Sequence, residues 1–295
     1  MAITELLTPS TRDELVAALA RATPHSRLLA GGTDLVRALR RPDQAPDLLI
    51  DLSGLDELAA VRLDGDKLRV GALATFTTIQ RHPLVREHAV CLGLAAAQVG
   101  SVQIRNAGTL GGNVANASPC ADGVTALAAL GAEVVILNAE GVETTRPIAE
   151  VVLGPNSTSL AYDEAIVEFA FPALGTEHRA GFSKIGSRTA VSVARLSCAL
   201  VVRFDAAAGT LASVRVALGA VGEAAFRAAR LERELEGRHA DEETARLFAA
   251  GCVAAVQESI PGRYSLPYKQ HAAVGLAYDA WNMLALVPPC EPAWD

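Results

Sequence analysis

The chain has 295 residues, of which 51% are hydrophobic and 20% charged, so it can bury a large core and is not intrinsically disordered. Its net charge of −7 is not interrupted by any block of lysine and arginine, which argues against a nucleic-acid-binding surface. No signal peptide is visible at the start, and no apolar run approaches the roughly 20 residues of a membrane helix, so we expect a soluble, cytoplasmic protein.

The first 54 residues predict a β-α-β-like unit. Thr11 and Glu14 have the spacing of a capping box and predict the start of a helix. Residues 27–29 predict a short strand, which ends in a turn at Gly31-Gly32. A helix over 35–39, capped by Thr33 or Asp34, and a strand over 48–51 complete the unit.

The second block, from about residue 54 to 172, mixes strands and helices. Residues 61–63 and 67–70 flank Asp64-Gly65-Asp66, which predicts a hairpin. The apolar pattern predicts helices over 84–99 and 124–130, and strands over 133–137 and 166–171.

The third block begins after a domain boundary near residues 173–176. Strands over 201–205 and 213–218 form an antiparallel pair, and helices follow over 223–235, 242–258 and 266–286. We therefore expect domains at 1–174, with subdomains of about 1–54 and 55–174, and at 175–295. Near the last helix, four aromatic residues form either a docking surface or a packed core: Tyr264, Tyr268, Tyr278 and Trp281.

Metal sites are not expected on this chain. The five cysteines stand singly, with no spacing typical of an iron–sulfur cluster, and read as free thiols: Cys91, Cys120, Cys198, Cys252 and Cys290. The six histidines show no pairing typical of a metal site.

Two glycine-rich segments are the most informative motifs. Residues 28–35 read Leu-Leu-Ala-Gly-Gly-Thr-Asp-Leu, and residues 104–113 read Ile-Arg-Asn-Ala-Gly-Thr-Leu-Gly-Gly-Asn. Neither fits the dinucleotide fingerprint G-x-G-x-x-G. Both are expected to be loops whose backbone N–H groups, with no side chain above them, can wrap a diphosphate.

The second segment, followed by Ala-Ser-Pro-Cys-Ala-Asp at 117–122, resembles the flavin-binding subunits of molybdenum hydroxylases, which include those of xanthine and carbon monoxide dehydrogenases. The resemblance covers nearly the whole chain. It implies an α+β fold, with a two-subdomain FAD-clasping domain like that of vanillyl-alcohol oxidase, followed by a sheet-plus-helices domain of the carbon monoxide dehydrogenase flavoprotein type.

The resemblance also implies which residues hold FAD. Segment 30–34 and the residues Thr109, Gly112 and Asn113 approach the diphosphate, Asp122 reaches a ribose or the adenosine end, and Lys184 lies near the flavin ring, where a cation would stabilise the reduced, anionic flavin. The full implied set is Leu29, Ala30, Gly31, Gly32, Thr33, Asp34, Thr109, Gly111, Gly112, Asn113, Asp122, Ile166 and Lys184.

Several of these residues have simpler interpretations. Asp122 has the position of a helix N-cap, Lys184 reads as a solvated strand lysine, and Ile166 reads as a core strand residue. Arg105 and Asn106 either contact the cofactor or form a salt bridge and turn.

By resemblance, this chain is the FAD-carrying electron-transfer subunit of a molybdenum hydroxylase. A small subunit carries [2Fe–2S] clusters and a large subunit carries the molybdopterin cofactor, in a heterotrimer or a dimer of heterotrimers. FAD passes electrons to NAD, quinone or oxygen, and no catalytic residue is expected here. We expect a xanthine dehydrogenase-like complex acting on an N-heterocycle or aldehyde. The alternatives are a carbon monoxide dehydrogenase, which the lack of aromatics at 151–153 and 189–191 disfavours, and a free-standing flavin oxidoreductase.

Overall fold

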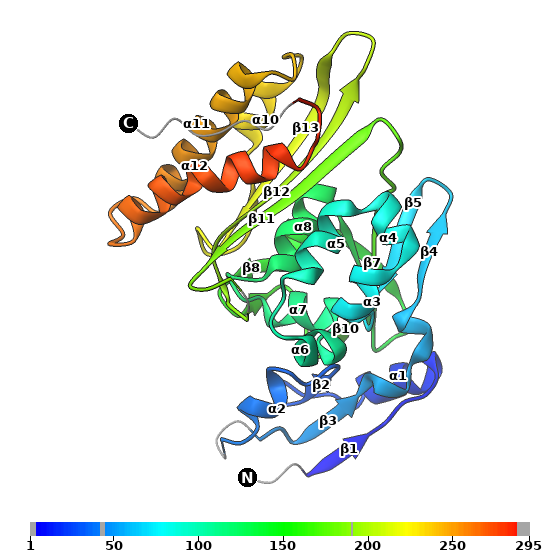
Figure 1. The fold of residues 1–295 in the computed structure, drawn as a ribbon. Coiled ribbons are helices and arrows are strands. Elements are labelled where there is room, and N and C mark those ends of the chain that lie inside the picture. The colour runs from blue at the N-terminus through cyan, green and yellow to red at the C-terminus, as the bar shows by residue number, and fades with distance from the viewer. Residues whose placement is uncertain (1–3, 42–44, 190, 288–295) are drawn as a thin grey trace.

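The computed structural model describes residues 4–41, 45–189 and 191–287. In this part of the chain three larger sheets follow one another, with helices packed against them, and a two-stranded sheet accompanies the second (Figure 1). The first sheet is parallel, with the order β1-β3-β2. Its elements are β1 (Glu5–Leu7), α1 (Arg12–Leu19), β2 (Arg27–Leu29), α2 (Leu35–Ala38) and β3 (Leu48–Asp51), followed by the short 3-10 helices η2 (Leu52–Gly54) and η3 (Asp56–Ala59). The α+β class expected from the sequence is confirmed.

The predicted capping of α1 is confirmed, whereas at α2 only the predicted N-cap position of Asp34 is confirmed. Thr11 Oγ1 accepts from the Glu14 N–H at 3.2 Å, and the Glu14 carboxylate accepts from the Ser10 N–H at 2.8 Å. Asp34 occupies the N-cap position of α2, but its side chain makes no capping hydrogen bond. It lies instead beside Arg37, with 3.7 Å between the charged groups.

The second sheet is antiparallel and has the order β4-β5-β10-β6-β7. Its strands are β4 (Val61–Asp64), β5 (Lys67–Gly71), β6 (Glu133–Asn138), β7 (Glu143–Pro147) and β10 (Glu164–Pro172). The helices of this block are α3 (Phe76–Arg81), α4 (Pro83–His88), α5 (Val90–Ala97), α6 (Val102–Ala107), α7 (Leu110–Asn116), α8 (Asp122–Leu130) and α9 (Ile148–Val151). A small hairpin joins β8 (Val152–Gly154) to β9 (Ser157–Thr158).

The single helix predicted over 84–99 is wrong, because the chain breaks at Ala89 into α4 and α5. The end of β10 explains the break. The Leu174 N–H donates to the His88 carbonyl at 3.0 Å, and His88 Nδ1 lies 2.9 Å from the Leu174 carbonyl. These long-range contacts occupy the His88 carbonyl, which would accept a hydrogen bond within a continuous helix. No local sequence pattern predicts them.

The third sheet has the order β11-β12-β13-β14, all antiparallel. Its strands are β11 (His178–Gly186), β12 (Ala194–Asp205), β13 (Thr210–Gly219) and β14 (Phe226–Arg227), and its helices are α10 (Ala229–Leu235), α11 (Glu242–Ser259) and α12 (Leu266–Asn282). The predicted helix over 223–235 is wrong in its first part, where β14 pairs with β13, and the predicted helix over 266–286 is too long by a few residues.

Helices cover both faces of the third sheet, because successive side chains of its strands point to opposite faces and both sets are apolar. Phe182 and Ala199 face α5 and α8 and share a hydrophobic cluster with Leu127, whereas Leu200 faces the opposite layer of α11 and α12 with Phe248 (Figure 1). Strands that are buried on both faces have nearly continuous apolar sequences, as residues 196–202 have apart from the buried Ser197. The hydrophobic core therefore continues across residue 174. The domain boundary near that residue stays a prediction.

The four aromatic residues near the last helix divide between the two interpretations. Tyr278 and Trp281 are buried, and Trp281 lies against Phe248 with ring centroids 5.9 Å apart, whereas Tyr264 and Tyr268 are exposed. Of the cysteines, Cys91, Cys198 and Cys252 are buried free thiols, Cys120 is partly buried, and Cys290 lies outside the described residues. No group of side chains suited to a metal ion, and no helix long and apolar enough to cross a membrane, occurs within 4–41, 45–189 or 191–287.

Candidate functional site

The second glycine-rich segment is helical, so the expectation of a loop over 104–113 is wrong. It forms α6 and the first turn of α7, and the chain between β5 and α3 fixes it from one side. The N–H groups of Gly111 and Leu110 donate to the carbonyls of Ala72 and Ala74 at 2.8 and 3.0 Å. A Cβ at Gly111 would lie 2.8 Å from the Ala72 carbonyl oxygen, so this glycine permits the close approach of two backbones.

The remaining donors at the start of α7 are also used within the protein. Thr109 is the N-cap: its Oγ1 accepts from the Gly112 N–H at 3.1 Å and its carbonyl from the Asn113 N–H at 3.0 Å. Every N–H group from Leu110 to Asn113 therefore has a protein partner. This segment is better suited to shaping the site than to donating backbone hydrogen bonds to a ligand.

The first glycine-rich segment, by contrast, offers free donors. Directly after β2, five successive backbone N–H groups donate to no other group of the described residues: those of Gly31, Gly32, Thr33, Asp34 and Leu35. Gly32 has a φ of +67°, which curls the chain and which a residue with a side chain adopts only with strain. A run of N–H groups in such a turn is an anion-binding concavity.

The two segments lie against each other. A Cβ at Gly31 would lie only 1.8 Å from the Ala107 carbonyl oxygen at the end of α6. The side chain of Ala30 reaches the neighbourhood of Gly112, where a Cβ would lie 4.0 Å from that of Ala30 and 3.0 Å from Thr109 Oγ1. Gly112 meets nothing else within 4 Å, so its Cα faces open space between the segments.

Two buried acceptors continue the site from α7 to α8. Among the described residues, Asn113 Oδ1 and Asp122 Oδ1 are buried without a hydrogen-bond partner. Both residues lie beside Gly123: Asp122 precedes it in the chain, and a Cβ added at Gly123 would lie 2.6 Å from Asn113 Oδ1. Buried acceptors without a donor are costly, which indicates a donor-bearing ligand.

The second oxygen of Asp122 forms a buried ion pair with Lys184. Lys184 Nζ lies 2.5 Å from Asp122 Oδ2 and donates to the Gln98 carbonyl at 3.0 Å, and the two side chains are only 6% and 4% exposed. The interpretation of Lys184 as a solvated lysine is therefore wrong. Asp122 is not an N-cap either, because that position belongs to Ala121 and the Asp122 carboxylate bonds to Lys184 instead of to the helix N–H groups.

Burial raises the pKa of Asp122 from 3.8 to about 6, against the opposing effect of the Lys184 ammonium. In the folded, FAD-free protein the carboxyl keeps its proton at a pH where the unfolded chain has lost it. The free energy of unfolding should therefore fall as the pH rises from about 4 to 6, by up to about 3 kcal/mol, and level off above. Urea denaturation across this range checks the slope, which Asp122→Asn should reduce; equal slopes in the two proteins would contradict it.

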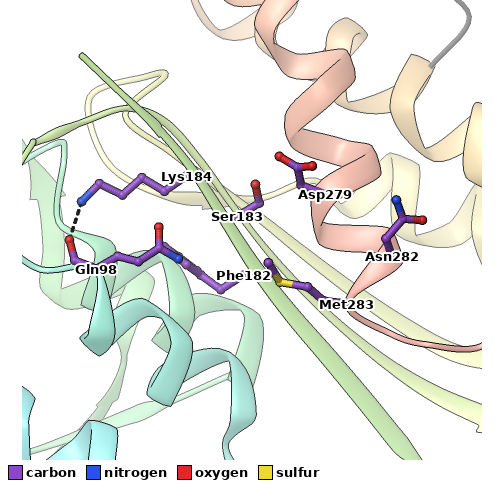
Figure 2. Close-up of a pocket in the computed structure, with 7 residues that line it drawn as sticks. All are labelled: Gln98, Phe182, Ser183, Lys184, Asp279, Asn282 and Met283. Carbon is purple, nitrogen blue, oxygen red and sulfur yellow. Dashed lines mark hydrogen bonds between the residues drawn. The ribbon is translucent and has the colours of Figure 1, made fainter. Parts of the chain in front are cut away.

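A cavity of about 410 Å³ adjoins the ion pair, between the end of α5, β11 and α12. Figure 2 shows Lys184 pointing from β11 toward Gln98, whereas Ser183 points to the other side, toward Asp279 on α12. Burial raises the pKa of Asp279, and the hydrogen bond with Ser183 lowers it. The lining of the cavity comes from both predicted domains and includes Lys184.

The structure places the remaining predicted residues less centrally. Thr33 and Asp34 carry two of the free N–H groups, and Leu29 is the last residue of β2, just before them. Ile166 is buried in β10, in the same hydrophobic cluster as Leu110 and Val114 of α7. Among the described residues Arg105 forms no salt bridge: it donates to the carbonyls of Val99 and Gly100, and Asn106 accepts from Thr77. Contact of Arg105 and Asn106 with the cofactor stays a prediction.

Three contributors to the site had no signal in the sequence. The Gln98 carbonyl, which accepts from Lys184, and the Ala107 carbonyl, which lies against Gly31, are backbone groups that any residue carries. The Leu35 N–H, one of the free donors, is likewise a backbone group that no sequence pattern indicated. Only the paired glycines indicated that backbone groups would matter here.

Comparison with known proteins covers both halves of the chain. The family described as "FAD binding domain in molybdopterin dehydrogenase" matches residues 2–174, and that described as "CO dehydrogenase flavoprotein C-terminal domain" matches residues 182–284. The chain is 32% identical to the nicotinate dehydrogenase FAD-subunit of Eubacterium barkeri, with 84% of each chain covered. It is 30% identical to a putative xanthine dehydrogenase FAD-binding subunit of Escherichia coli K12, with 84% of this chain and 85% of that one covered.

The structure is similar to solved oxidoreductases over nearly its whole length. A chain of carbon monoxide dehydrogenase from Hydrogenophaga pseudoflava matches with a TM-score of 0.86 at 28% identity, covering 95% of this chain and 96% of that one. A chain of quinoline 2-oxidoreductase from Pseudomonas putida matches with a TM-score of 0.83 at 26% identity, covering 97% and 96%. The sequence and fold comparisons agree with each other.

Proposed function

The chain belongs to the family of FAD-binding subunits of molybdopterin dehydrogenases. We propose that the site between its two glycine-rich segments holds FAD, with each part of the cofactor beside the protein groups that can hydrogen-bond to it. The free N–H groups of residues 31–35 would hold the diphosphate. The unpartnered oxygens of Asn113 and Asp122 would accept from sugar or ribityl hydroxyls. Lys184 would stand beside the ring.

The single observation that carries this assignment is the separation of donors from acceptors. An anion needs the N–H donors, and hydroxyl groups suit the two buried acceptors, which would repel a phosphate. FAD carries both kinds of group, joined in sequence. The residues thus fit the cofactor, although the second segment would contribute shape and acceptors and not the backbone donors first expected of it.

When bound, FAD would supply the exchange of electrons between carriers and an external acceptor. The chain's own residues would fix its position, and the buried Lys184 would favour negative charge on the reduced ring. Asp122 would moderate that effect, because its carboxylate neutralises the ammonium at 2.5 Å. No described residue needs to act as a catalytic acid or base in this account.

We further propose that the electrons reach this chain from [2Fe–2S] clusters of a small subunit, which draws them from a molybdopterin-carrying large subunit, and that the acceptor is NAD, quinone or oxygen. The relatives support a multi-subunit dehydrogenase, since they are named as FAD subunits or medium chains. Two relatives at 30–32% identity are named for nicotinate and xanthine, which supports an N-heterocycle as substrate of the whole complex; an aldehyde is the other substrate class we propose. A dimer of heterotrimers is the assembly we expect.

Purification of the complex from its own host tests this function. FAD, iron and molybdenum should elute together with this chain, and the complex should oxidise an N-heterocycle or aldehyde. Oxidation of carbon monoxide instead would identify the alternative complex. Elution of the FAD-bound chain alone, with full substrate turnover and no metal, would point to a free-standing flavin oxidoreductase and would contradict the proposed assembly.

A further inference from the structure

The cavity of about 410 Å³ lies at the free edge of the third sheet. β11 is the first strand in the order β11-β12-β13-β14, so one of its edges pairs with no other strand of the described residues. The lining comes from the end of α5, which packs on one face of this sheet, from β11 itself, and from α12, which packs on the other face. The cavity therefore lies where the two faces of the sheet meet.

Polar side chains of decreasing exposure line this cavity. Asp279 on α12 is exposed to solvent, whereas Ser183 is 4% exposed and the Lys184 side chain is 6% exposed. Figure 2 shows Ser183 pointing toward Asp279, and Lys184 pointing the other way, toward Gln98. The lining thus extends from a carboxylate at the solvent to the ammonium group that is ion-paired with Asp122.

The surroundings of Asp279 suit the binding and release of protons. Burial raises the pKa of its carboxyl group, Ser183 lowers it, and no charged group of the described residues contributes to the shift. A carboxylate that is fixed in an ion pair is held in its charged form, as a carboxyl without such a partner is not. Asp279 can therefore exchange its proton with the solvent on one side and with the cavity on the other.

The proposed cofactor needs a proton at the buried end of the cavity. Reduction of FAD to its anionic form takes up two electrons and one proton, and the proton forms an N–H bond at N5 of the ring. In the proposed function the electrons come from iron–sulfur clusters, which supply electrons without protons. The proton must therefore come from the solvent, and the proposed place of the ring is beside the buried Lys184.

We propose that Asp279, Ser183 and the water of this cavity form the route by which the proton passes from the solvent to the flavin ring beside Lys184. The inference rests on the proposed function. Asp279 releases a proton from its carboxyl oxygen into the cavity and regains one from the solvent, so the residue is unchanged after each transfer. A polar cavity of this volume has room for several water molecules, and the side chains that line it offer them hydrogen-bond partners.

Proton uptake during flavin reduction tests the route in the full-length, FAD-loaded chain. Reduced methyl viologen supplies electrons but no protons, and a pH-indicator dye in weakly buffered solution follows proton uptake after rapid mixing. In wild type, proton uptake should keep pace with the loss of the viologen colour. It should be at least about 10-fold slower in Asp279→Asn, and slower than wild type in Ser183→Ala. Asp56→Asn, at an exposed aspartate of the second block, should match wild type.

Two kinds of rescue separate proton transfer from a structural role. Asp279→Glu keeps a carboxyl group and should take up protons nearly as fast as wild type, and added formic acid, a small proton donor, should restore the rate in Asp279→Asn. All variants should keep equimolar FAD. Wild-type rates in both Asp279→Asn and Ser183→Ala, or a slow rate that neither rescue restores, would overturn the route but leave the proposed function intact. A wild-type chain that holds no FAD would instead refute the proposed function itself.

Discussion

Replacing Gly112 by Val should yield a folded protein that contains no FAD. The added side chain would enter the open space between the two glycine-rich segments, because a Cβ there meets only Thr109 Oγ1 at 3.0 Å and the Ala30 Cβ at 4.0 Å. The loss of stability should be modest, since valine in place of glycine within the first helical turn requires only a small shift of Thr109. Flavin content after purification and the far-ultraviolet circular dichroism spectrum measure the two effects.

Two other glycines serve as comparisons. Gly93→Val in α5 places its Cβ in ordinary contact with Val85 at 3.5 Å, away from the site, and should keep equimolar FAD. Gly31→Val should damage the fold, because its Cβ would lie 1.8 Å from the Ala107 carbonyl. Gly32 is a poor choice for this test, since its φ of +67° strains any larger residue. Retention of FAD by Gly112→Val would contradict the proposed position of the cofactor.

Replacing Lys184 by Met should both destabilise the protein and make the flavin harder to reduce. The variant leaves the Asp122 carboxylate, which is 4% exposed, without its partner, and breaking a buried pair in this way costs about 3–5 kcal/mol. A solvated lysine would have little effect on melting, so the size of the loss distinguishes the two interpretations. Denaturant titration and the flavin reduction potential are the two measurements.

The partner variant gives an effect of opposite sign on the potential. Asp122→Asn keeps an acceptor oxygen but frees the Lys184 ammonium from its counter-charge, so the reduction potential should rise where Lys184→Met lowers it. The double variant, which removes both charges, should recover part of the stability lost in Lys184→Met. An unchanged potential in both single variants would mean that the ion pair lies away from the flavin ring and is only structural.

The sequence allowed the fold to be predicted where local chemistry decides it. The capping box at Thr11, the hairpin around Gly65 and the buried strand over 133–137 each depend on residues close together in the chain, and the structure confirms all three. The helix over 84–99 failed because Leu174, far along the chain, takes a carbonyl of His88. No periodicity of the segment itself records that contact.

The candidate site was also predictable only where residues close together in the chain decide it. The paired glycines indicated backbone involvement, but the sequence could not show that Gly111 serves the approach to Ala72 while the free donors belong to residues 31–35. The pairing of Asp122 with Lys184, 62 residues apart, exists only because α8 packs on the third sheet. Each residue alone had a simpler interpretation, and only their proximity makes a buried ion pair.

The central claim is that the site between the glycine-rich segments holds FAD, and the flavin content of the purified full-length chain tests it most directly. The protein should carry the visible absorption bands of oxidised flavin, and heat or acid should release FAD in an amount equal to the protein. Removal and re-addition of FAD should restore the bands in wild type and not in Gly112→Val. A folded wild-type chain that carries no flavin and takes up none when FAD is supplied would contradict the account.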